Sequence, residues 1–148
     1  MGLTIKYRED LVLLPSWLLE IVKLHCSKGF LSLEYPIYIR NHVRDVHSNL
    51  ELDLVITCGK KRIVVELKEA DLAKVVEQIG RRKLLGDYAY IALNLRVHDI
   101  IGALRNYSKL LEHGIGIVST RDNCIVIRAY SPRKISEARR YLELLEKI

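Results

Sequence analysis

The chain has 148 residues, 49% of them hydrophobic and 28% charged, which suits a single globular domain over residues 1–148 and leaves no room for a second core. No apolar run reaches the roughly 18 to 20 residues of a membrane-spanning helix, and the first ten residues lack a signal-peptide core, so we expect a cytoplasmic protein with no membrane partner. The net charge of +6 favours polyanionic partners, nucleic acid first.

The segment after Pro15 predicts a helix and then a strand. Apolar residues recur at helical spacing over 17–28, and Gly29 supplies a stop. Residues 30–40 alternate in polarity and are rich in aromatics. Because Pro36 lies inside this run and cannot donate a ladder hydrogen bond, we expect an edge strand or a bulged strand.

A hairpin is predicted next. Residues 41–49 are polar and irregular, and two short apolar runs follow, over 51–57 and 62–68. The sequence Gly59-Lys60-Lys61 between them is typical of a tight turn joining antiparallel strands.

The second half of the chain predicts three helices and three strands. Helical periodicity with capping or terminating residues marks the helices, and nearly continuous apolar runs mark the strands. The expected helices cover 72–85, 99–113 and 132–147, and the expected strands cover 88–93, 115–119 and 124–130. The whole is an α/β chain with an α-β-β-β-α-β core and a C-terminal α-β-β-α extension, in which a mixed β-sheet is flanked by helices.

Three charged residues interrupt the predicted hairpin. Asp53 lies on its first strand, and Glu66 and Lys68 lie two positions apart on the second, so these two share a face. Charged side chains in a strand of core character are rarely buried without a partner or a metal. The hairpin brings Asp53 near the strand end that carries the other two, so we expect two carboxylates and an ammonium to converge at one sheet edge. A strand-surface salt bridge is the alternative interpretation.

This set of groups suits metal-dependent hydrolysis of a phosphodiester. Mg²⁺, or Mn²⁺ in its place, takes oxygen ligands and is commonly held by one or two carboxylates, which makes Asp53 and Glu66 the candidate ligands. A lysine beside them can orient the attacking water and offset the charge that builds on the phosphate. We predict that role for Lys68.

The spacing of these residues resembles the PD-(D/E)xK nuclease superfamily. Thirteen positions separate Asp53 from Glu66, and one spacer precedes Lys68. The order of elements over residues 15–94 is similar as well, most of all to archaeal Holliday-junction resolvases and to Mrr-type and RecB-like nuclease domains. The proline that precedes the family's aspartate is replaced by Leu52. The resemblance implies a restriction-endonuclease-like fold and Mg²⁺-dependent cleavage of DNA.

The resemblance also implies further site residues. Several of these nucleases place an acid on the first helix, where Glu20 matches as a third metal ligand, with an ordinary solvated glutamate as the alternative. Related domains carry a glutamine on the helix after the lysine strand, and Gln78, the single glutamine of the chain, lies there. Lys74, Arg81 and Arg82 fall along the same stripe and are candidates to follow a phosphate backbone.

Weaker candidates surround the triad. Lys60 and Lys61 form a basic turn that we place next to the site, where they suit DNA contact, although a solvated hairpin tip fits them equally. His42 and His47 precede Asp53 in the irregular stretch and are candidates to contact substrate. Four strand tyrosines can stack on unpaired bases or pack in the core: Tyr35, Tyr38, Tyr88 and Tyr90.

Two remaining features concern redox state and assembly. The three cysteines form no CxxC pair, so we expect reduced and mostly buried thiols at Cys26, Cys58 and Cys124. A homodimer is a further expectation, because nucleases of this kind often cut two strands. Its apolar contact would come from Leu142, Leu144, Leu145 and Ile148.

The sequence therefore predicts a Mg²⁺-dependent endonuclease that acts on DNA, with structure-selective cleavage in repair, recombination or defence as the expected context. Two alternatives stay open: a nuclease-fold protein that binds nucleic acid without cleaving it, and a nuclease that acts on RNA.

Overall fold

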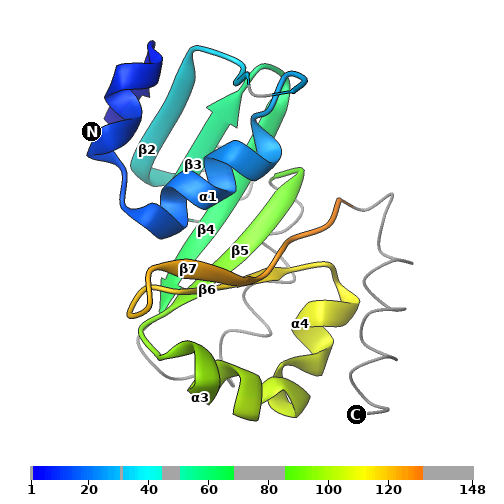
Figure 1. Cartoon of the computed structure of the whole chain (residues 1–148). Helices are drawn as coiled ribbons and strands as arrows, with labels where there is room; N and C mark the ends of the chain where they lie inside the picture. The colour runs from blue at the N-terminus through cyan, green and yellow to red at the C-terminus, as the bar shows by residue number, and fades with distance from the viewer. Residues whose placement is uncertain (1, 31, 45–50, 69–85, 132–148) are drawn as a thin grey trace.

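The computed structural model describes residues 2–30, 32–44, 51–68 and 86–131, and Figure 1 shows them as coloured ribbons. Seven strands form a single sheet whose spatial order follows the chain. The strands are β1 (Gly2–Ile5), β2 (Ile37–Arg44), β3 (Glu51–Cys58), β4 (Lys61–Lys68), β5 (Tyr88–Leu93), β6 (Gly116–Ser119) and β7 (Cys124–Ile127). The helices are η1 (Arg8–Leu13), α1 (Ser16–His25), α3 (Val97–Gly102), η3 (Leu104–Tyr107) and α4 (Ser108–Glu112).

The sheet is mixed, which confirms the predicted α/β class. The strands β1 to β4 pair antiparallel with one another, β4, β5 and β6 pair in parallel, and β7 pairs antiparallel with β6. A parallel step needs a crossover connection of a dozen or more residues, and the chain between β4 and β5 has that length. The helices predicted over 72–85 and 132–147 lie outside the described residues.

Helices cover both faces of the sheet. In Figure 1, α1 crosses in front of the strands, whereas α3 and α4 lie toward the lower end. Each face has its own apolar core, because alternate side chains of a strand point to opposite sides. The core under α1 includes Leu18, Ile21, Ile56, Ile63 and Tyr90, and the core under α3 and α4 includes Val55, Val64, Ile91, Ile100 and Leu111.

The N-terminal part of the sheet differs from the prediction in two ways. The strand β1 and the short helix η1 were not predicted, and β1 pairs with β2, so β2 is an interior strand and not an edge strand. The strand β2 also begins later, at Ile37, because Pro36 lacks the backbone donor of a ladder residue. It then continues to Arg44, through part of the stretch predicted to be irregular.

The helix predicted over 99–113 is broken into three short pieces, α3, η3 and α4. Gly102 ends the first piece, and glycine is a weak helix former because it loses more backbone entropy than other residues. At the other end of the chain, α1 is shorter than the predicted 17–28 and stops at His25. The final strand is likewise shorter than predicted and ends at Ile127.

The expectation of three reduced thiols was wrong for two of them. Cys26, which follows α1, forms a disulfide with Cys58 at the end of β3, and both side chains are fully buried. The β3–β4 hairpin places Cys58 directly against the end of α1. The two cysteines are 32 residues apart in the sequence, so no local pattern indicated that they are close in space. Cys124 remains a thiol, and burial together with the carboxylates of Glu20 and Asp122 raises its pKa. No helix in the described part of the chain is both long and apolar enough to cross a membrane.

Candidate active site

The candidate site lies where the pairing of β3 with β4 stops. The register runs from Cys58–Lys61 to Leu54–Val65, and the next pair in the same register would be Asp53 and Glu66. In place of a backbone bond there, the Asp53 carboxylate accepts the Leu67 N–H through Oδ2 at 2.9 Å. The Asp53 carboxylate therefore sits against the peptide bond that joins Glu66 to Leu67.

Glu66 is a buried acid, with only 2% of its surface exposed. It follows Val64 by two positions and pairs with Ile91 of β5, and both of these neighbours belong to the core under α3 and α4. A carboxylate is seldom held in such surroundings unless it is paired or binds a cation. The predicted convergence of the two acids is thus compatible with the positions of β3 and β4.

The third member of the predicted triad, Lys68, ends β4 and pairs with Leu93, the last residue of β5. Its side chain lies outside what the structure describes, so its role remains a prediction. The location of the strand end is informative, because in α/β sheets ligands bind in the crevice beyond the carboxyl ends of parallel strands. The ends of β4 and β5 lie side by side at that edge.

The donor atoms fit a hard divalent cation. Asp53 and Glu66 offer carboxylate oxygens, the ligands that such cations take, and the Leu67 N–H orients the Asp53 carboxylate by donating to its Oδ2. Among the residues that the structure describes, no three His, Cys, Asp or Glu side chains gather closely enough to hold a metal ion together. Mg²⁺ does not require three, since water and substrate phosphate complete its coordination.

Glu20, the predicted third ligand, occupies a different place. Its Oε2 accepts the Ile125 N–H of β7 at 3.2 Å, and three strands separate β7 from β3 in the sheet order. A second bond runs between the same two elements, because the Trp17 N–H at the start of α1 donates to Asn123 Oδ1 at 2.9 Å. Glu20 therefore helps to join α1 to β7 and is not placed beside Asp53.

The basic turn also lies elsewhere. Lys60 and Lys61 are at the closed end of the hairpin, where Gly59 turns the chain with a positive φ of 57°. Asp53 is six residues away along β3, roughly 20 Å at the rise of an extended strand. The expectation that this turn lies next to the site was wrong, because a hairpin separates its turn from its open end. Lys61 Nζ instead donates to the His25 carbonyl at 3.0 Å. Several predicted residues lie outside the described part of the chain: His47, Lys74, Gln78, Arg81 and Arg82, and the predicted dimer contacts Leu142, Leu144, Leu145 and Ile148.

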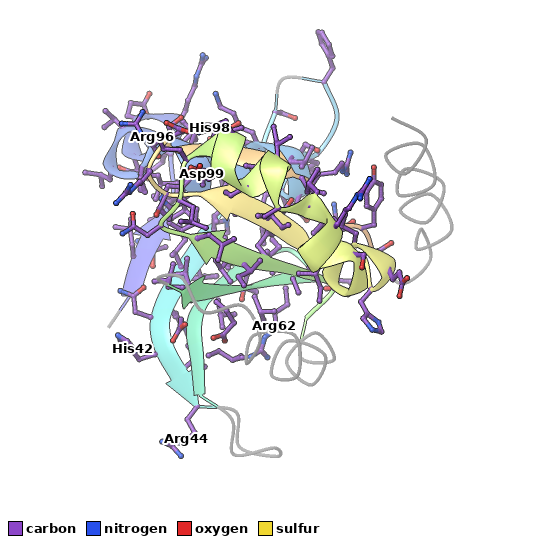
Figure 2. All side chains as sticks on the ribbon, turned by 90° about the horizontal axis from the view of Figure 1, so that it is seen from below. His42, Arg44, Arg62, Arg96, His98 and Asp99 are labelled. Carbon is purple, nitrogen blue, oxygen red and sulfur yellow. A yellow bond between two sulfur atoms is a disulfide. The ribbon has the colours of Figure 1, made fainter. Side chains whose placement is uncertain are left out.

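The end of β2 lies beside the site. Its residues belong to the stretch 41–49, which was predicted to be irregular. Asn41 pairs with Leu54 and Val43 with Leu52, so His42 stands opposite Asp53 in this register. His42 has a positive φ of 51°, which interrupts the regular pairing at this point. Figure 2 shows His42 and Arg44 projecting at the lower rim of the molecule, away from the residues labelled near α3. Exposed side chains at the even-numbered positions of β2 continue as far as Arg44. This alternation was the signal in the sequence that could have assigned His42 and Arg44 to the strand.

A buried polar pair, His25 and Tyr90, lies on the opposite face of the sheet. His25 at the end of α1 is 2% exposed, its Nε2 lies 2.5 Å from the Tyr90 hydroxyl, and its ring stacks on Tyr88 at 3.9 Å. Burial, aided by the charges of Arg128 and Lys61, lowers the pKa of His25 to about 3. Burial also raises the pKa of Tyr90. Both groups are therefore neutral at physiological pH and serve the fold.

No protein-family model, curated protein or solved structure matches the chain. The case for function therefore rests on the residues of this chain and on their arrangement.

Proposed function

We propose that this protein is a Mg²⁺-dependent endonuclease that hydrolyses phosphodiester bonds in DNA. One observation carries the proposal: the Asp53 carboxylate lies against the Glu66–Leu67 peptide bond, at the open end of a hairpin whose second strand buries the Glu66 carboxyl. The proposal is supported by the positions of Asp53, Glu66 and Lys68 near a strand end that adjoins the end of a parallel neighbour. The net charge of +6 is suited to a polyanionic substrate.

Each residue has a distinct role in this proposal. Asp53 and Glu66 hold the cation through their carboxylate oxygens, and the Leu67 N–H fixes the orientation of the Asp53 carboxylate. A bound Mg²⁺ supplies Lewis-acid polarisation of the scissile phosphate. Lys68 orients the attacking water and offsets the negative charge that grows on the phosphate oxygens.

The test compares two aspartates that make the same kind of bond to β4. Asp53 accepts the Leu67 N–H near the end of β4, and Asp87 accepts the Arg62 N–H near its start at 2.8 Å. Asparagine keeps an oxygen that can accept the N–H but removes the charge. We expect Asp53→Asn to abolish cleavage with Mg²⁺ in a screen of duplex, branched and single-stranded DNA, whereas Asp87→Asn cleaves like the parent protein.

Calorimetry with Mn²⁺ completes this test. The parent protein is expected to bind the ion and Asp53→Asn to bind it at least tenfold more weakly, with thermal unfolding unchanged. Cleavage by Asp53→Asn at the parent rate would refute the proposal.

A second candidate is a nucleic-acid-binding protein without turnover. It is favoured by the bond between Asp53 and the Leu67 N–H, because a carboxylate that replaces a missing strand-pairing bond has a structural use of its own. This alternative predicts that Asp53→Asn changes neither metal binding nor nucleic-acid binding, and that no substrate in the screen, RNA included, is cut.

A further inference from the structure

A groove runs along the outer strands of the sheet, beside the candidate site. It has a volume of about 520 Å³ and lies over β1 and the middle of β2, with Thr4, Tyr38, Arg40 and His42 in its lining. Pockets of about 300 to 1,000 Å³ hold drug-sized ligands, so there is room for a nucleotide. Gly2 lets β1 lie close against β2 along this groove, because a Cβ at that position would lie 2.8 Å from the Ile39 carbonyl oxygen and 3.2 Å from Cγ of Arg40.

The chemistry of the lining is suited to a nucleic-acid strand. The groove is lined by an arginine, a histidine, an asparagine, a threonine and a tyrosine, and no aspartate or glutamate is among its lining residues. Tyr38 is 39% exposed, so its ring has an accessible surface, and Arg40 is exposed next to it on the same face. An exposed aromatic ring beside a cation is the arrangement that stacks an unpaired base and binds the adjoining phosphate.

The groove leads directly to the acidic site. Arg40 pairs with Val55 of β3, and two residues further along β2 the register brings His42 opposite Asp53. Neighbouring strands lie about 5 Å apart, so a ligand on β2 that passes His42 reaches β3 within one strand spacing. Charged and aromatic groups therefore continue from the groove to the position of the two carboxylates.

We propose that this groove binds a single-stranded segment of nucleic acid, with an unpaired base on Tyr38 and a phosphate on Arg40, and guides it past His42 to Asp53 and Glu66. The cleavage of the bound nucleic acid rests on the proposed function, whereas its binding in the groove does not. It predicts a substrate with unpaired nucleotides, such as a flap, a branch or a free single strand, because a base held in a duplex cannot stack on Tyr38.

Binding is measured by fluorescence anisotropy with a labelled oligothymidylate, in EDTA so that no cleavage occurs. We expect Tyr38→Ala to weaken binding roughly tenfold, the loss typical of one stacked base, and Tyr38→Phe to restore it because the ring is kept. Arg40→Gln is expected to reduce the slope of log affinity against log salt by about 0.7, the contribution of one phosphate contact on a single strand. A hairpin duplex should bind more weakly than the oligothymidylate and should not respond to Tyr38→Ala.

The controls remove the same groups elsewhere on the surface. Phe30→Ala deletes an aromatic side chain that is 94% exposed, and Arg121→Gln removes an exposed cation from the β6–β7 turn. Both are expected to bind like the parent protein. An oligouridylate that shows the same dependence on Tyr38 and Arg40 supports the groove equally, since stacking and phosphate contact do not require the deoxyribose.

The outcomes separate this inference from the nuclease proposal. If binding depends on Tyr38 and Arg40 but the protein cleaves no substrate, the groove inference is supported and the nuclease proposal is refuted. If cleavage depends on Asp53 but Tyr38→Ala and Arg40→Gln bind like the parent protein, the groove inference is refuted. An equal loss with Arg121→Gln would show attraction by net charge alone and would overturn the inference too.

Discussion

The two ends of β4 are built differently. At its start, Lys61 Nζ donates to the last carbonyl of α1, and Asp87 both accepts the Arg62 N–H and donates its own N–H to the Arg62 carbonyl at 2.7 Å. The neighbouring Cys58 is bonded to Cys26. Every one of these contacts ties β4 or its hairpin to another segment of the chain. We call the start of β4 its fixed end, because these contacts hold it to the rest of the fold.

At its other end, β4 leaves its antiparallel partner. Regular pairing with β3 stops at Leu54 and Val65, and the next positions in the same register are those of Asp53 and Glu66. The Asp53 carboxylate accepts the Leu67 N–H here, where regular pairing has ended. If this end carries the proposed site, the firmly held start of β4 gives that site a rigid support. The comparison predicts that changes at the start of β4 alter stability, whereas changes at its end alter activity.

The largest expected effect concerns the fixed end and is a loss of stability in acid. The pKa of His25 is about 3 in the folded protein and near 6.5 in the unfolded chain. Above pH 6.5 both states are neutral there. Between pH 6.5 and 3 the unfolded chain alone binds the proton, so the free energy of unfolding falls by about 1.4 kcal/mol per pH unit, roughly 5 kcal/mol in all.

Urea unfolding at a series of pH values measures this loss. His25→Gln cannot titrate and should flatten the dependence over this window. His98→Gln removes a side chain that is 81% exposed and should leave the dependence as in the parent protein. A slope that persists in His25→Gln would assign the acid sensitivity to other groups.

The next effect concerns the open end of β4. Glu66→Gln keeps the size of the side chain but removes a carboxylate oxygen from the proposed cation site. We expect the cleavage rate to fall roughly a thousandfold, about 4 kcal/mol in the barrier, with the free energy of unfolding lowered by no more than about 1 kcal/mol. Single-turnover cleavage and urea unfolding measure the two quantities. Glu112→Gln, the same change at an exposed position of α4, should alter neither. A variant that cleaves normally but unfolds readily would make Glu66 a structural residue.

The disulfide at the fixed end has a smaller effect, on stability alone. It closes a loop with a sequence separation of 32, for which chain-entropy reasoning gives about 3 to 4 kcal/mol. The double variant Cys26→Ala with Cys58→Ala should lose about that much free energy of unfolding, and a reducing agent should do the same to the parent protein. Cys124→Ser should unfold like the parent. Cleavage at a temperature where all variants are folded should be unchanged, and a loss of activity there would contradict the separation of the two ends.

The sequence predicted the local features of the fold well and the long-range ones less well. The hairpin of β3 and β4 followed from two short apolar runs joined by a turn at Gly59, and β5 followed from a continuous apolar run that proved buried. Local patterns determine such elements. The strand β1 is only four residues long, and its pairing with β2 spans more than thirty residues of sequence, so no local pattern indicated it.

The candidate site shows the same division. The positions of Asp53 and Glu66 on one hairpin were predictable, since antiparallel strands fix which residues face each other. The disulfide, the attachment of Lys61 to α1 and the closeness of His42 to Asp53 depend on how separate elements pack. Side chains that serve either packing or chemistry, such as Glu20, can be sorted only when their partners in space are known.

The smallest expected effect concerns Glu20 and tests whether it belongs with the site or with the fold. Glu20→Gln retains an oxygen that can accept the Ile125 N–H. Its thermal unfolding should therefore match that of the parent protein, and its cleavage rate should stay within about twofold of the parent rate. Asn123→Ala removes the acceptor for the Trp17 N–H at the start of α1 and should cost about 1 kcal/mol, as the loss of a helix cap does, again without a change in cleavage. Thermal unfolding and the cleavage assay provide both readings. If Glu20→Gln lost activity at unchanged stability, the carboxylate charge would matter in its own right, and Glu20 would again be a candidate for the proposed cation site.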